Sequence, residues 1–144
     1  MGITMWAKNS SIELDMGYGA FHNLRRNIAA VLDPAIGDLY HQLASVMTDD
    51  VIEAERQLYK ILSDDEKFPD EKVGGVIDFL FLPDVEATLG HKACKQVYDL
   101  IKDVDFEDKG FQYVSHRTSG KNDYELLKEL LKECYQHRRK LRWS

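Results

Sequence analysis

The chain has 144 residues, 44% of them hydrophobic and 31% charged, with three prolines, two cysteines and a formal net charge of −6. This composition excludes disordered, collagen-like and disulfide-stapled classes and indicates one globular domain, residues 1–144, that can bury a core without a metal. The negative charge repels a phosphate backbone, so nucleic acid is not an expected partner, whereas a protein with a basic surface is.

The N-terminal segment has the pattern of a β-hairpin. A β-compatible run, 3–7, is followed by turn-like residues 8–10 and by an alternating run, 11–16. The positions of the second run that would face the core are Ile12, Leu14 and Met16. Because an isolated hairpin is marginally stable, it must pack on helices or gain another strand. The candidate third strand is Leu141-Arg142-Trp143, from the other end of the chain.

Helical periodicity begins after Gly17-Tyr18-Gly19. The first helix would carry Arg25 and Arg26 on its polar face and end at Asp33-Pro34, where Asp33 caps a second helix that starts at Pro34. The polar break 48–50 supplies a cap and acidic first turn for a third helix. The apolar positions of the three helices are Phe21, Leu24, Ile28 and Val31, then Ile36, Leu39, Tyr40, Leu43, Val46 and Met47, then Val51, Ala54, Leu58 and Leu62.

Two or three further helices follow, depending on the run 73–82, which makes five or six in all. After the polar loop 63–71, the apolar run 73–82 favours a short helix ending before Pro83, although a buried strand has the same composition. Thr88 is the expected N-cap of the next helix, and the residues 122–125 form a capping box for the last one. The apolar stripes of these two helices are Cys94, Val97, Tyr98 and Ile101, and Tyr124, Leu127, Leu131 and Cys134. We therefore predict a mainly helical α+β domain with an N-terminal hairpin and a third strand from the C-terminus.

The most specific candidate site lies where the predicted hairpin meets the first helix. Gly17 and Gly19 would let an anion approach the free amides of the helix N-terminus, with Arg25 and Arg26 near by. A dinucleotide fingerprint, however, needs a third glycine where this chain has His22, and a βαβ context. The simpler interpretation is that the glycines turn the chain and the arginines are solvated or paired.

No pattern predicts a metal or another cofactor. Residues 103–110 begin like a calcium loop but lack its glycine at the sixth position and its glutamate at the twelfth, which leaves an acidic surface loop. The histidines have no metal-ligand spacing: His22, His41, His91, His116 and His137.

No catalytic residue is predicted either. Cys94 and Cys134 lie on apolar helical stripes, where a thiol is a small buried hydrophobe and a poor nucleophile. The paired acids at 49–50 and 64–65 fall at a helix start and in a loop, where the helix dipole or solvent accounts for them.

Two surface features remain. The basic run 137–142 would stabilise a helix C-terminus through the dipole, or else contact an anionic partner. Trp6 lies on the outward face of its strand, where we expect Trp143 or a loop to cover it; the alternative is an interface anchor.

The chain is expected to be cytoplasmic. Its cysteines form no C-x-x-C pair, and its first residues lack the basic and apolar regions of a signal peptide. The longest nearly uncharged apolar run, 73–83, is about half of what a bilayer span requires, so no membrane partner is predicted.

The stretches 1–3, 17–29, 94–98 and 127–143 together resemble a group of small uncharacterised proteins of Gram-positive bacteria, some from mobile elements. Small acidic α+β proteins of that kind are sometimes immunity proteins, which neutralise a toxin domain through surface complementarity. The resemblance implies a bacterial origin more than an activity.

Binding rather than catalysis is the expected function. We predict a protein–protein interaction module, immunity-like in the sharpest version, although such a charge also serves solubility alone. The alternatives are a small-molecule or nucleotide-binding protein or minor enzyme that uses the corner 17–26, and nucleic-acid binding through the run 137–142. A concave site lined by converging His, Asp and Arg side chains would contradict the prediction of a protein–protein interaction module.

Overall fold

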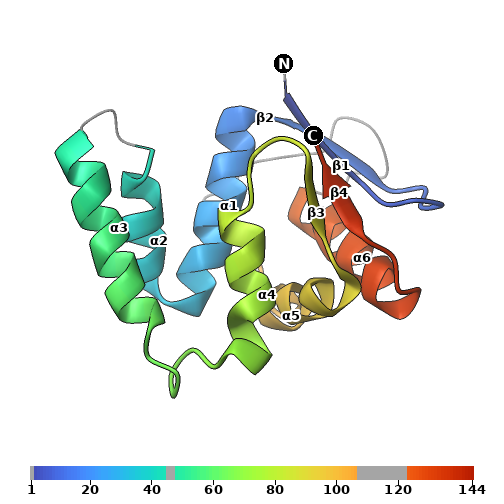
Figure 1. Cartoon of the computed structure of the whole chain (residues 1–144). Helices are drawn as coiled ribbons and strands as arrows, with labels where there is room; N and C mark the ends of the chain where they lie inside the picture. The colour runs from blue at the N-terminus through green and yellow to red at the C-terminus, as the bar shows by residue number, and fades with distance from the viewer. Residues whose placement is uncertain (1, 45–47, 107–122) are drawn as a thin grey trace.

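The computed structural model describes residues 2–44, 48–106 and 123–144. Within these ranges it has six helices and one four-stranded antiparallel sheet, which confirms the predicted α+β class (Figure 1). The elements are β1 (Gly2–Trp6), β2 (Glu13–Gly17), α1 (Tyr18–Leu32), α2 (Pro34–Gln42), α3 (Thr48–Leu62), α4 (Asp70–Phe81), β3 (Ala87–Leu89), α5 (His91–Ile101), α6 (Asp123–Gln136) and β4 (Leu141–Trp143).

The sheet joins both ends of the chain. Its strand order is β2-β1-β4-β3, so the predicted C-terminal strand is confirmed and lies between β1 and a fourth strand that the sequence did not predict. The expected N-cap role of Thr88 is wrong: Thr88 pairs with Arg142 in β3, and α5 begins three residues later, after Gly90. Thr88 is in a strand because it pairs with β4, more than 50 residues later in the chain, and the residues next to Thr88 do not indicate that pairing.

One face of the sheet packs on helices, as the alternating pattern predicts. The buried strand residues are Ile3, Met5, Leu14, Met16, Ala87, Leu89, Leu141 and Trp143. Trp6 lies on the other face, 38% exposed, with the Arg142 guanidinium 5.6 Å from its ring centroid. The expectation that Trp143 covers Trp6 is therefore wrong, because Met5 pairs with Trp143 and both point into the core.

α1 and α3 follow their predicted boundaries, and α2 begins at Pro34 as predicted. The predicted end of α2 is wrong, because α2 ends at Gln42 and the Ala44 amide then donates to the His41 carbonyl, three residues back, at 3.2 Å. The Asp33 carboxylate accepts a hydrogen bond from the Ala35 amide at 2.9 Å, which confirms that Asp33 caps α2. The same carboxylate forms an ion pair with Lys67 at 2.8 Å. α1 and α2 approach closely at Gly37, where an added Cβ would lie 2.7 Å from the Cβ of Ala30. Figure 1 shows α2 and α3 side by side at the end of the molecule away from the sheet. Val46 and Met47, predicted for the second helix, lie outside the described residues.

α4 lies between α3 and α5 and ends before Pro83, as predicted. Its backbone meets α5 at Gly75, where an added Cβ would lie 2.5 Å from the Cα of Ala93. The Gln96 side chain links the two helices, because it accepts the Gly75 N–H at 2.5 Å and donates to the Glu71 carbonyl at 2.9 Å. α4 thus has one side fixed to α5 and the other directed toward α3. No helix in the described part of the chain is both long enough and apolar enough to cross a bilayer.

Candidate functional site

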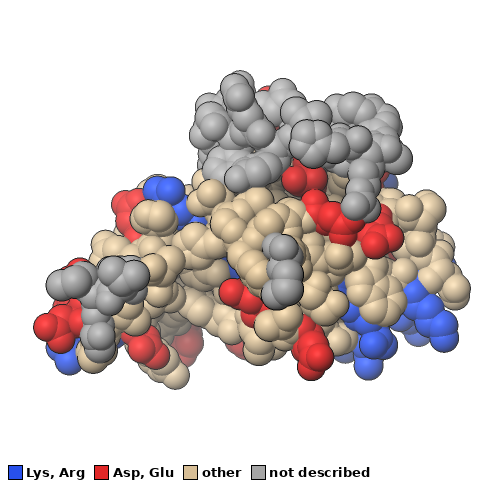
Figure 2. Space-filling model, turned by 90° about the horizontal axis from the view of Figure 1, so that it is seen from above, with Lys and Arg blue, Asp and Glu red and all other residues tan. Residues whose placement is uncertain are grey.

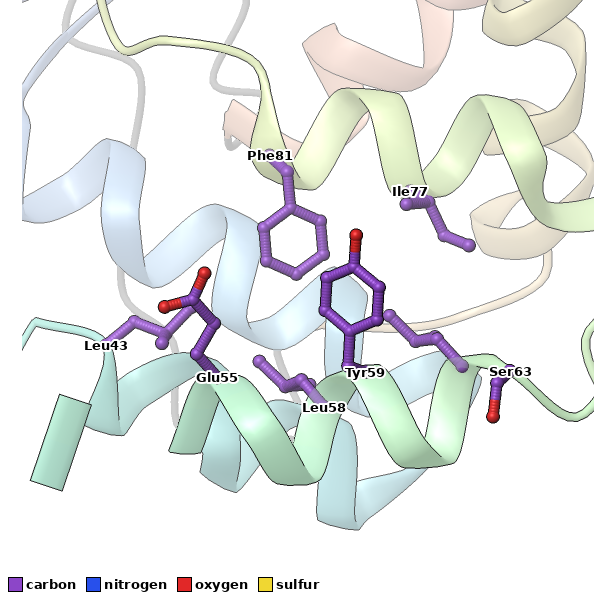
Figure 3. A pocket seen from close by; sticks show the side chains of 8 residues that line it. Leu43, Glu55, Leu58, Tyr59, Ser63, Ile77 and Phe81 are labelled. Carbon is purple, nitrogen blue, oxygen red and sulfur yellow. The ribbon is translucent and has the colours of Figure 1, made fainter. Parts of the chain in front are cut away.

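The candidate site is an apolar groove between α3 and α4, with a volume of about 530 Å³ (Figure 3). Helical spacing places its α3 residues on one side of that helix, and its two α4 residues lie one turn apart. The residues that line it are Leu43, Glu55, Leu58, Tyr59, Leu62, Ser63, Ile77 and Phe81.

The floor and the walls of this groove differ in exposure. Leu58 is buried at 3% exposed and belongs to the core, whereas its neighbour Tyr59 is 76% exposed. Figure 3 shows the Tyr59 ring rising from α3 between Phe81 and Ile77. The Phe81 ring also contacts Tyr40, with 5.8 Å between the ring centroids, so this wall rests on the core. The groove therefore has a fixed apolar base and an open apolar rim.

More exposed apolar surface adjoins the groove. Ile52 is 51% exposed and precedes Tyr59 by seven residues, so both lie on the same side of α3. Phe81 is 41% exposed on the opposite wall. Three of the six large hydrophobic side chains that the described residues expose thus gather about one concavity.

Negative charge is concentrated on α3, which forms one wall of the groove, and on the residues that follow this helix. Residues 48–66 contain seven acidic residues and two basic ones, a net charge of −5 out of −6 for the chain. The basic residue Arg56 is paired with Glu53 at 3.4 Å. Glu55, in the groove itself, forms no hydrogen bond or ion pair within the described residues. In Figure 2, the largest visible group of Lys and Arg side chains lies at the end of the molecule away from α3.

Arg25, one of the predicted anion-site residues, is in the core rather than on the polar face of α1. It is 2% exposed, and its guanidinium donates to the Leu82 carbonyl at 2.7 Å and to the Asp84 carboxylate at 2.9 Å. Its carbon Cζ lies 4.4 Å from the ring centroid of Phe21 and 5.4 Å from that of Trp143. Arg25 is thus paired, which is one of the two predicted alternatives, but its predicted place on the polar face of α1 is wrong, because aromatic faces and a helix-end carbonyl replace its water.

His22, Tyr40, His41 and Asp84 gather around Arg25. The His22 ring stacks on Tyr40 at 5.1 Å between centroids and lies 5.8 Å from His41. Burial, followed by the nearby His41, lowers the pKa of His22, and burial also lowers the pKa of Arg25. None of the three cavities described for the molecule is lined by these residues. The cluster joins α1 and α2 to the segment that follows α4.

The remaining residues of the predicted anion site stay near the surface. Gly17 and Gly19 are exposed, and a Cβ at either position would meet open space. Gly17 precedes α1 in an extended conformation, and Arg26 is half-buried. An anion at this corner would be held without Arg25, and the site remains a prediction.

Cys94 and Cys134 lie in contact between α5 and α6, and both are buried. The Cys94 thiol donates to the Leu89 carbonyl at 3.7 Å, while its hydrogen bond with Cys134 and its burial raise its pKa. Both side chains fill the core between α5 and α6, and the raised pKa keeps the Cys94 thiol protonated.

The other predicted features are placed as follows. In the described part of the chain, no three His, Cys, Asp or Glu side chains are grouped so that they could hold a metal ion. His116 and residues 107–110 of the calcium-like loop lie outside the described residues, as does Asn122 of the capping box. The basic run 137–142 follows α6, whose last turn has no basic residue, and the Arg139 guanidinium donates to the Asn9 carbonyl at 3.2 Å. The Arg139 amide donates to the Cys134 carbonyl at 2.8 Å, so the run does lie at the end of α6, and its stabilising role there stays a prediction.

Comparison of the chain with protein-family models, with curated proteins and with solved structures found no match. The argument for function therefore depends on the geometry of the groove.

The sequence contained a sign of the groove that our sequence analysis missed. Ile52, Glu55 and Tyr59 form a second stripe on α3, outside the predicted core stripe. An apolar stripe in excess of what a helix buries marks a surface that another element can cover.

Proposed function

We propose that this protein is a protein–protein interaction module that receives an apolar element of a basic partner in the groove between α3 and α4. The observation that carries the proposal is the exposure of Tyr59 and Phe81 in the walls of one apolar groove, with Ile52 exposed on the same side of α3; all three are more than 40% exposed. Exposed apolar side chains that gather in one patch, rather than singly, are typical of interaction sites.

The energetics support binding through this surface. Complete burial of one large apolar side chain contributes roughly 1.5–3 kcal/mol, and aromatic residues dominate the few interface positions that decide affinity. Tyr59 has most of its surface still to bury, and its hydroxyl can stay at the wet rim.

The charge supports a basic partner. The net charge of −5 on residues 48–66 would steer a basic surface toward the groove and accelerate association. An immunity-like role, in which the partner is a basic toxin domain, is one form of this proposal. Cytoplasmic location is part of it as well, since the two free thiols suit a reducing compartment.

Selection from a random-peptide display library tests the proposal. We expect peptides that bind the unmodified protein and the control variant Tyr18→Ala, and that bind Tyr59→Ala about tenfold more weakly or worse. Tyr18 is a suitable control because it is 41% exposed, undergoes the same truncation and does not line the groove.

The proposal would be abandoned if selection yielded no peptide that depends on Tyr59. A small apolar compound that bound the groove in place of any peptide would support the alternative of a small-molecule-binding protein.

A further inference from the structure

We infer that the element received by the groove is a short amphipathic α-helix with Lys or Arg on its polar face. The inference rests on the proposed function and specifies the chemistry of the partner. Three independent features of the groove carry it: its length, the state of the backbone in its walls, and its charge.

The length of the groove matches two turns of a helix. Its lining on α3 runs from Glu55 to Leu62, about 10 Å at 1.5 Å per residue. The facing wall, from Ile77 to Phe81, runs about 6 Å, which is one turn. A guest helix with apolar residues at positions i, i+3, i+4 and i+7 presents a stripe about 10 Å long, which fits this base.

The walls leave no backbone partners for an extended segment. α3 and α4 bond their own amides and carbonyls, and at the end of α3 the Tyr59 carbonyl accepts the Ser63 amide at 3.1 Å. The next carbonyl, of Lys60, accepts the Ser63 hydroxyl at 2.7 Å. An extended guest would bury amides without partners, whereas a helix satisfies its own. The groove thus selects a guest whose backbone is already hydrogen-bonded.

The charge of the groove selects the polar face of the guest. Glu55 has no partner within the described residues, and the seven acidic residues of 48–66 lie on or beside α3. The cavity between α4 and α5 provides a contrast, because its lining has three lysines against two acidic residues, whereas Glu55 is the one charged residue that lines the groove. A basic helix is therefore directed to the α3 side of α4.

The test uses fluorescently labelled peptides of about 15 residues, roughly four helical turns. The first has Leu and Phe at i, i+3, i+4 and i+7 and Lys at the remaining positions. The second has a central proline, which breaks the helix but keeps the composition otherwise, and the third has Glu in place of every Lys. Affinity is measured by fluorescence anisotropy at low and high salt, and helix formation by circular dichroism.

We expect the basic helical peptide to bind at least about tenfold more tightly than either relative, to gain helicity on binding and to weaken in high salt. Glu55→Gln should weaken it about threefold. The control Glu53→Gln removes the same charge from the same helix outside the groove and should have a smaller effect.

The outcomes separate this inference from the proposed function. Equal binding of the proline peptide would refute the helix, and equal binding of the Glu peptide would refute the basic face. In both cases the docking of an apolar element in the groove survives if binding is lost in Tyr59→Ala and kept in Tyr18→Ala, but the second result would remove the basic character of the partner from the proposed function. If no peptide, designed or selected, depends on Tyr59, the proposed function fails and this inference fails with it.

Discussion

The regions around Arg25 and Tyr59 are connected by the ring contact between Tyr40 and Phe81. They differ in which kind of side chain each region exposes to water. Around Arg25, a charged group is withdrawn from water and enclosed by aromatic rings. Around Tyr59, an aromatic ring is left in water above a buried floor. The first region uses reactive side chains to hold the fold, and the second leaves apolar surface unused by the fold. Function is therefore better sought in the second.

The largest expected effect is on the Arg25 side of this comparison. Arg25→Ala should destabilise the protein by about 3 kcal/mol, because it leaves the Leu82 carbonyl unpaired and opens a cavity between aromatic rings. Arg25→Lys, which keeps the charge but loses the planar fork, should lose about half as much. Urea denaturation measures both changes as shifts of the midpoint.

The neighbouring Arg26→Ala is the control, and we expect a change within about 0.5 kcal/mol. Equal losses for the two arginines would mean that the aromatic enclosure contributes nothing, and the contrast between the two regions would disappear.

Arg25 also marks the limit of what the sequence could predict. Helix periodicity predicted α1, the start of α2 and the break at Asp33 correctly, because those features depend on neighbours within a few residues. The inward turn of Arg25 depends on Trp143 and Asp84, which are distant in sequence, as does the pairing of Thr88 in β3. Local patterns cannot supply such contacts.

The candidate site was missed for a related reason. An apolar residue on a helix has the pattern of a core residue whether or not another element covers it, so the sequence around Ile77 and Phe81 does not distinguish a buried side chain from an exposed one. Only the position of α3 relative to α4 reveals that part of this surface stays open. The anion corner at Gly17 and Gly19 was located correctly as a helix start, but its arginine partner was not.

A smaller loss is expected where α2, which carries Tyr40, meets α1. Gly37→Ala would place a Cβ 2.7 Å from the Cβ of Ala30, so the two packed helices must move apart. We expect this to lower the free energy of unfolding by about 2 kcal/mol. Gly74→Ala is the matched control on α4, where the nearest atom is the end of the Asp70 side chain. There we expect no loss, or a gain of up to about 1 kcal/mol from helix propensity. Thermal denaturation distinguishes the two, and a loss at Gly74 as large as at Gly37 would contradict the close packing of α1 on α2.

A weaker effect should appear with pH in the Arg25 cluster. Burial, together with His41, Arg26 and Arg25, lowers the pKa of His22 below its ordinary value of 6.5, against the opposing effect of Asp84. Between the lowered pKa and 6.5 the unfolded chain binds more protons than the folded one, so stability should fall as pH drops through 6.5. The hydrogen bond from Lys67 lowers the pKa of Asp33 below its ordinary value of 3.8, so the titration of Asp33 changes stability only at a more acidic pH than that of His22.

His22→Gln should flatten the slope of unfolding free energy against pH between about 7.5 and 5.5, whereas His137→Gln, at an exposed position, should keep it. A slope that persists in His22→Gln would assign the titration to another group.

The smallest effect on stability should come from the groove, and it decides whether the two regions truly differ. Tyr59→Ala removes a ring that is 76% exposed and replaces it with a better helix former, so the unfolding free energy should stay constant or rise by up to about 0.5 kcal/mol. Leu58→Ala, one residue earlier but in the floor, should lose about 3 kcal/mol. A loss of about 2 kcal/mol or more at Tyr59 would mean that the ring packs into the protein in solution. The protein's own side chains would then fill the groove, and Tyr59, like Arg25, would stabilise the folded state rather than bind a partner.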